Sequence, residues 1–307
     1  MRFKDSPVFQ YFRGPLLHAG GVDPTGWLWS DWNIEPTIAI GLLAMLAGYL
    51  FLTRDPGSTP NPDRVTTSKQ KASFIAGLFT LFVALGPPLD DWSDHYLLLA
   101  HMVQHLLLIL LAAPLLLVGT PGWMLEPLTR NRVTNAIGYW LTRPVIAYAI
   151  ANLVVVVWHV PTFYDAALRS QPMHVLEHAT FIATGILAWW PIAGPLPQWP
   201  RLPLSLQSLY FFAMTIPGSI VGAFITFAEP GLYSPYDSAR RIFNIDLATD
   251  QQAGGLLMWV LVSTIYLGLI TATFFKWANR EEQNEQQARE IAARPTQAVR
   301  PDAPAAR

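Results

Sequence analysis

Long apolar runs divide the chain into seven segments. Hydrophobic residues dominate positions 35–53, 72–89, 95–118, 144–161, 173–191, 205–228 and 251–276, and the only Lys or Arg in these runs is Lys276 at the end of the last one. Each run has about the 20 residues that a helix needs to cross a ~30 Å hydrocarbon layer. The alternating pattern of a membrane β-barrel is missing. The pattern therefore predicts an all-α, polytopic membrane helix bundle with seven transmembrane helices.

The composition supports a membrane protein and excludes several classes of function. Hydrophobic residues make up 52% of the chain and charged residues 13%, about half the charged share of a soluble domain. The chain has no Cys, so disulfides and thiolate metal sites are excluded. The sequence has no phosphate-binding loop, dinucleotide fingerprint or nucleophile elbow. It has no basic face, so we expect a lipid bilayer and no nucleic acid among its partners.

The distribution of basic residues predicts the orientation. The loops after the first, third and fifth predicted spans and the C-terminal tail, counted from Lys276, hold 14 of the 20 Lys and Arg residues. Basic residues favour the cytoplasmic side, so the N-terminus is expected outside and the C-terminus in the cytoplasm. We divide the chain into an extracytoplasmic N-terminal segment (1–34), a seven-helix transmembrane domain (35–279) and a cytoplasmic tail (280–307), which we expect to be a frayed helix that passes into disorder.

Six of the seven histidines fall in the outer half of the predicted membrane or at its surface. Four of them form two matched pairs, in the sequences HMVQH and HVLEH. Spacing of i,i+4 places both members of a pair on one helix face, and polar groups in membrane helices tend to face the bundle interior. Neutral imidazole is the commonest metal ligand. The pattern predicts an outward-facing metal or haem site with the candidate ligands His101, His105, His174, His178, His95 and His159.

Each candidate also has a simpler interpretation. A histidine in a membrane helix often only donates a hydrogen bond to a neighbouring helix. Gln104 and Glu177 could orient a ligand, or bond another helix. Asp250 could admit a cation, or complement the dipole at a helix start. Met258 could be a soft ligand for cuprous ion, or an apolar side chain that only packs against its neighbours.

HVLEH also matches a motif of soluble zinc proteases, in which the glutamate acts as a base. The sibling motif HMVQH carries Gln104 at the position of that base, and the context is a membrane span. A protease is therefore disfavoured. No bond-making chemistry is required by the other motifs, and we expect a protein that is not an enzyme.

Four stretches resemble a known family in order and spacing. They are AHMVQHLLLILLAAPLLLVG, WHVPTFYDAAL, HVLEHATFIATGILAWWPI and DQQAGGLLMWV, and the resemblance around them covers roughly residues 90–275. They resemble the seven-span cytochrome c oxidase assembly factors of the CtaG type, known from caa-type oxidases of Gram-positive bacteria. The matched positions are His101, Gln104, His105, Trp158, His159, Pro161, His174, Glu177, His178, Asp250 and Gly254.

The resemblance implies a multi-pass protein of the bacterial cytoplasmic membrane that helps to make active haem–copper oxidase. It implies a role in forming the copper centre, with the oxidase catalytic subunit as partner. Copper is then the expected ion, taken up from a possible copper donor protein. Two alternatives stay open: a bis-histidine haem-binding membrane protein, and a scaffold for the oxidase subunit that binds no metal.

Overall fold

The computed structural model describes residues 35–54 and 64–293, and these ranges contain helices and no strand. The helical class predicted from the sequence is confirmed. The predicted N-terminal segment 1–34 lies outside the described residues. The helices of the first half are α2 (Pro36–Leu52), α3 (Ser68–Leu85), α4 (Leu89–His95), α5 (Leu98–Leu106), η3 (Leu107–Ala112), α6 (Ala113–Gly119), α7 (Gly122–Arg130) and α8 (Arg132–Leu141).

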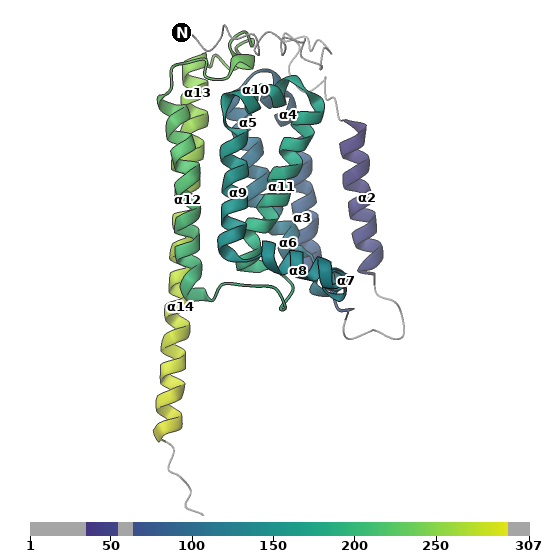
Figure 1. Cartoon of the computed structure of the whole chain (residues 1–307), viewed down its shortest axis with the longest axis vertical. Coiled ribbons are helices and arrows are strands. Elements are labelled where there is room, and N and C mark those ends of the chain that lie inside the picture. The colour runs from purple at the N-terminus through teal and green to yellow at the C-terminus, as the bar shows by residue number, and fades with distance from the viewer. Residues whose placement is uncertain (1–34, 55–63, 294–307) are drawn as a thin grey trace, which may run out of the picture.

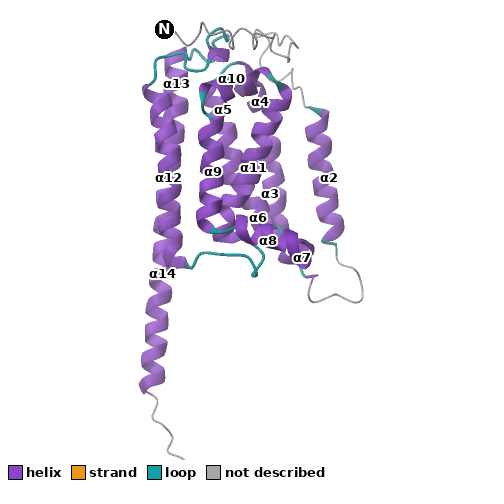
Figure 2. Ribbon diagram, viewed as in Figure 1, coloured by secondary structure: helices purple, strands orange, loops and turns teal. Residues whose placement is uncertain are grey.

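The second half continues the same architecture, with short helices between long ones (Figures 1 and 2). Helices α4 and α10 lie at one end of the bundle, and α7 and α8 lie at the other. Helix α11 packs against α9 and α6, while α12 packs against α13 and α14. The helices are α9 (Pro144–Trp158), α10 (Pro161–Arg169), α11 (Gln171–Ala193), α12 (Leu204–Phe227), η4 (Ser234–Tyr236), α13 (Leu247–Leu256), η5 (Leu257–Leu261) and α14 (Val262–Ala293).

Five helical segments in the described ranges are long and apolar enough to cross a membrane. They are Ser68–His95, Leu98–Gly119, Gln171–Ala193, Leu204–Phe227 and Leu247–Ala292. Helices α8 and α9 form a sixth if they count as one span, although they meet at a bend of 74°. Helix α2 is apolar but has 17 residues. The count of seven and the orientation stay predictions.

The outward faces of the long helices are apolar, as a lipid-facing surface requires. Large hydrophobic side chains with at least 60% of their surface exposed occur on α2, α3, α9 and α12: Ile40, Leu43, Phe51, Phe79, Val145, Leu153, Leu209, Ile220 and Phe227. A water-soluble protein rarely exposes apolar surface so widely. The chain is therefore a membrane protein.

Local signals fix where several helices begin. Thr67 and Gln70 form a reciprocal capping box at the start of α3. Proline occupies the first turn of α2, α9, α10 and α11, where its missing N–H leaves no hydrogen bond unmade. Asp246 caps α13 by accepting hydrogen bonds from the amide and hydroxyl of Thr249. These bonds lower the pKa of the Asp246 carboxyl.

Helices α12 and α13 approach closely because glycines face each other. A Cβ on Gly222 would lie 2.8 Å from the Gly255 carbonyl oxygen, and one on Gly255 would lie 2.7 Å from the Gly222 carbonyl oxygen. Both distances are shorter than atoms of this kind tolerate. Small residues at such crossings let membrane helices pack backbone to backbone.

Gly255→Ala is expected to lower the free energy of unfolding by ~1–3 kcal/mol, because the added methyl meets backbone that cannot yield. Unfolding in mixed detergent and dodecyl sulfate micelles, followed by circular dichroism, measures the change. Gly48→Ala is the matched control, since a Cβ there has nothing within 4 Å. Equal stability of the two variants would contradict the close packing.

Helix α14 continues past the apolar run that predicts the last span. It has 32 residues, so it is about 48 Å long at ~1.5 Å per residue. Its last turns are polar and exposed, and they project beyond the end of the bundle that holds α7 and α8 (Figure 1). Residues 280–293 are helical, and the division of the chain into a transmembrane domain and a tail stays a prediction. Residues 294–307 lie outside the described part of the chain.

Candidate metal centre

The four paired histidines occupy equivalent places in two helices. His101 and His105 are the fourth and eighth residues of α5, and His174 and His178 are the fourth and eighth residues of α11. Each pair therefore lies on one face of its helix, within two turns of the helix start. Helix α11 directly follows α10 and α5 follows α4, so both pairs belong to the end of the bundle that holds these short helices (Figure 1).

The start of α5 is held by a carboxylate from another helix. Asp250 of α13 accepts hydrogen bonds from the backbone amides of Leu98 and Leu99, each at 2.9 Å. No side chain of the adjoining residues caps α5. Asp250 is fully buried, and each of its two carboxylate oxygens accepts one of these bonds. It acts on the site by fixing the helix that carries His101 and His105.

The imidazole rings of the two pairs meet between the helices. Ring centroids are 4.2 Å apart for His101 and His105, and 4.1 Å apart for His174 and His178. Across the helices, His178 lies 5.6 Å from His105 and 6.2 Å from His101. The convergence expected from the two motifs is present for all four rings.

Glu177 lies in the middle of these rings. Its Oε1 is 3.6 Å from His105 Nε2, and its Oε2 is 3.8 Å from His101 Nε2. The side chain is fully buried, and neither carboxylate oxygen has a hydrogen-bond partner. The sequence offers Glu177 as a residue that orients a ligand or bonds a helix, whereas the structure places it among the donors themselves.

The histidine–glutamate cluster, as we name it, consists of His101, His105, Glu177 and His178. One donor atom from each lies within 4.8 Å of the others. Two ligands of one ion lie no more than ~4.2 Å apart, since metal–nitrogen bonds are about 2.0–2.1 Å long. Shifts of less than ~1 Å would therefore bring all four atoms to one ion. The residues fit a metal ion of the size that imidazole and carboxylate bind.

Hydrogen bonds indicate which ring nitrogen of His101 is available. Tyr236 donates its hydroxyl proton to the Ser93 carbonyl oxygen at 2.6 Å, and its oxygen is 3.3 Å from His101 Nδ1. The Nδ1–H of His101 is then the donor to Tyr236, and the lone pair resides on Nε2. That atom faces Glu177, as a metal ligand in this cluster requires.

A second candidate group adjoins the first and shares one residue with it. Asp94, His101 and His174 each offer an atom within 4.8 Å of the others. The Asp94 carboxylate is 3.5 Å from His174 Nδ1. In the sequence Asp94 is only part of an acidic cluster before the third span, and no motif singles it out. No sequence motif points to Tyr236 either, because this residue comes from the connection between α12 and α13.

Three tyrosines cover the site. Tyr164 of α10 stacks on Tyr233 with ring centroids 3.9 Å apart, and its hydroxyl is 3.1 Å from that of Tyr236. Tyr233 donates a hydrogen bond to the His159 carbonyl oxygen at 2.9 Å. No side chain of the histidine–glutamate cluster is more than 8% exposed. The site is therefore enclosed by protein side chains.

The remaining candidates lie around the cluster or apart from it. His159 ends α9 with its ring 5.8 Å from that of His105, and it belongs to neither group. His95 belongs to neither group, and its Nδ1 is 3.2 Å from the Asp91 carbonyl oxygen. Gln104 points away and donates to the Ala84 carbonyl oxygen and to Asp90, each at 2.8 Å. Gln104 thus bonds neighbouring helices.

Comparison with known proteins gives one match. A profile of the cytochrome c oxidase caa3 assembly factor family matches residues 45–280, which is most of the chain. The chain belongs to this family. No curated protein and no solved structure matches the chain.

Membership in the caa3 assembly factor family confirms the resemblance drawn from the four motifs. The matched range includes every residue of the histidine–glutamate cluster and both helices that carry it. An assembly factor serves in building another protein, so membership favours a role that is not catalytic. The family name gives cytochrome c oxidase as the protein whose assembly is served. A bundle of apolar, membrane-spanning helices agrees with this family.

Proposed function

We propose that the chain binds one copper ion in the histidine–glutamate cluster and passes it to the catalytic subunit of the oxidase during assembly. The observation that carries this proposal is the Glu177 carboxylate. It is fully buried between two imidazole nitrogens and has no hydrogen-bond partner. A buried carboxylate without compensation is strongly destabilising. A bound cation supplies that compensation.

The donor set agrees with copper. Three imidazole nitrogens and one carboxylate oxygen suit copper, zinc, iron and nickel, and the chain offers no thiolate. Among these ions, copper is the one that the resemblance to oxidase assembly factors implies. In this proposal the ion is cargo, supplied by a copper donor protein outside the membrane and released to the oxidase subunit. The chain performs no bond-making step.

Haem fits the site less well. A macrocycle needs a pocket of at least ~300 Å³. The cavity that adjoins His105 and His159 has a volume of about 70 Å³. The imidazoles of the cluster are also packed against one another, with no layer of free space between them. A small ion needs no such space.

Glu177→Gln is expected to lower the affinity for cupric ion by ~10–100-fold, because the anionic donor is lost while the shape is kept. Equilibrium dialysis of the purified protein in detergent, with copper measured by mass spectrometry, gives the affinity. Wild-type protein should hold about one ion per chain. The matched control is Glu126→Gln, since Glu126 is half exposed on α7.

The same preparations separate the alternatives. Unchanged copper affinity in Glu177→Gln would contradict the proposed ligand set. A haem Soret band that survives purification would favour the haem-binding alternative. A wild-type protein that takes up no copper but supports oxidase assembly would favour the scaffold.

A further inference from the structure

A second chamber lies beside the histidine–glutamate cluster, deeper in the bundle. It is a cavity of about 70 Å³ lined by residues of α5, η3, α9, α12, η5 and α14. A water molecule needs ~10–15 Å³ of such space, so the cavity has room for an ion and a few small groups. His105 lines this cavity and also belongs to the cluster, so the two are neighbours.

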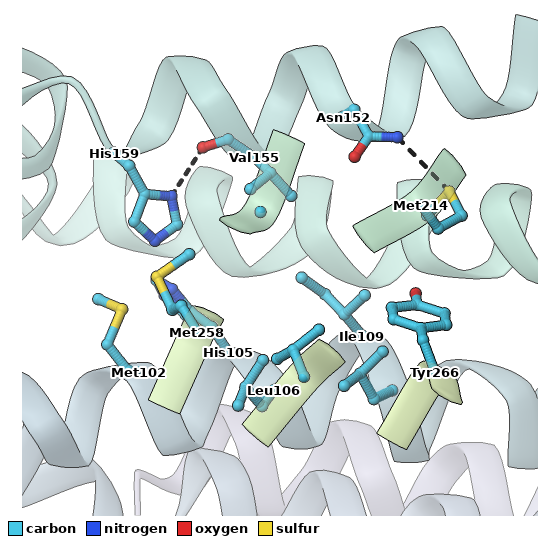
Figure 3. A pocket seen from close by; sticks show the side chains of 13 residues that line it. Met102, His105, Leu106, Ile109, Asn152, Val155, His159, Met214, Met258 and Tyr266 are labelled. Atoms are coloured by element: carbon cyan, nitrogen blue, oxygen red, sulfur yellow. Dashed lines mark hydrogen bonds between the residues drawn. The ribbon is translucent and has the colours of Figure 1, made fainter. Parts of the chain in front are cut away.

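Thioether sulfurs and imidazoles supply the ligand chemistry of the cavity. Met102 of α5, Met214 of α12 and Met258 of η5 line it, which is three of the seven methionines in the chain. Figure 3 shows Met102 and Met258 at the end occupied by His105 and His159. Met214 lies at the other end, where its sulfur accepts a hydrogen bond from Asn152 at 3.5 Å.

His159 has one ring nitrogen that makes no hydrogen bond. Its ring is buried, and Nδ1 donates to the Val155 carbonyl oxygen at 2.7 Å (Figure 3). The lone pair therefore resides on Nε2, which has no hydrogen-bond partner. A buried polar atom that lines a cavity and makes no hydrogen bond is rare and indicates a missing partner.

Irregular helix turns shape two walls of the cavity. The π-helical segments η3 and η5 interrupt the helices that run from α5 to α6 and from α13 to α14. Ile109 and Leu110 of η3 line the cavity, and so does Met258 of η5. Such π-turns redirect side chains and occur frequently at functional sites.

We propose that this chamber is a separate site for cuprous ion, with Met102, Met258 and the Nε2 atom of His159 as ligands. Thioether sulfur and imidazole select the soft, monovalent ion. No carboxylate is found among the described residues that line the cavity, so a divalent ion would lack charge compensation. The histidine–glutamate cluster, which is the proposed cupric site, contains the Glu177 carboxylate, whereas the described lining of this cavity contains no carboxylate. The two sites differ in ligands and in the ion they prefer.

Silver(I) is the probe, because it mimics cuprous ion without redox chemistry. The purified full-length chain in detergent is titrated with silver(I) against a competing chelator. The variant carries Met102→Leu and Met258→Leu, which remove both sulfurs and keep the volume at a cost below ~1.5 kcal/mol each. Silver affinity is expected to fall by roughly tenfold or more. The control carries Met45→Leu and Met124→Leu, which lie outside the cavity.

Two results would overturn the proposal. One is equal silver affinity in the double variant and the control. The other is an X-ray absorption spectrum of the cuprous-loaded protein without a sulfur neighbour of the metal. Glu177→Gln keeps this test independent of the proposed function: it should lower cupric affinity and leave silver affinity within about twofold.

Discussion

Replacing both His101 and His105 with asparagine is expected to abolish cupric-ion binding in the histidine–glutamate cluster and the assembly of active oxidase. The two changes remove half of the donors of the histidine–glutamate cluster, and Asn is too short to place its amide where an imidazole nitrogen was. A change beside a metal ligand already lowers affinity by ~10–100-fold, so the loss of two ligands should exceed the upper figure. Copper content by mass spectrometry and oxidase activity in membranes are the measurements.

His95→Asn is the control that the structure provides. His95 lies in α4, six residues before His101, and the sequence places it among the ligands. In the structure it belongs to neither candidate group. The variant should bind copper like the wild type. Preserved copper content and assembly in the His101/His105 double variant would defeat the ligand hypothesis and favour the scaffold.

Asp250→Ala is expected to lower the free energy of unfolding by roughly 2–6 kcal/mol. The change leaves the amides of Leu98 and Leu99 buried without acceptors, and each lost partner costs ~1–3 kcal/mol. Helix α5 would then begin later or shift, and His101 is only three residues beyond Leu98. We therefore expect copper affinity to fall together with stability, although Asp250 does not touch the cluster.

Unfolding in mixed micelles and dialysis against copper measure the two effects on one preparation. Asp246→Ala is the control, since Asp246 is exposed and caps its own helix through Thr249. It should change stability less and leave copper affinity unaltered. Wild-type copper affinity in a destabilised Asp250→Ala variant would show that α5 keeps its position without this cap.

The sequence predicts most of the fold because membrane helices leave strong signals. Long apolar runs mark the spans, and the spacing of the histidines shows which helix faces meet. Span ends are less predictable. The run at 251–276 suggests an end near Lys276, but polar residues with high helix propensity extend α14 to Ala293. The 74° bend between α8 and α9 has a local signal, because α9 begins at Pro144 and the residue before a proline disfavours the helical conformation.

The candidate site is predicted in part. His101, His105, His174 and His178 follow from their motifs, because i,i+4 spacing is a local property. The motifs do not predict that Glu177 lies at the centre of the cluster. Gln104 holds the same position in the sibling motif, yet its side chain turns toward α3 and α4. Asp94 and Tyr236 join the site through contacts between distant segments, which no local pattern records.

The length of α14 has a practical consequence for experiments. The histidines lie at the end of the bundle near α4 and α10, and the projecting turns of α14 leave the opposite end (Figure 1). A fluorescent protein or affinity tag fused directly to the last turn of α14, after Ala293, would therefore be held away from the metal-binding end by the full thickness of the bundle. Labels attached there can report on localisation or purification without touching the ligands.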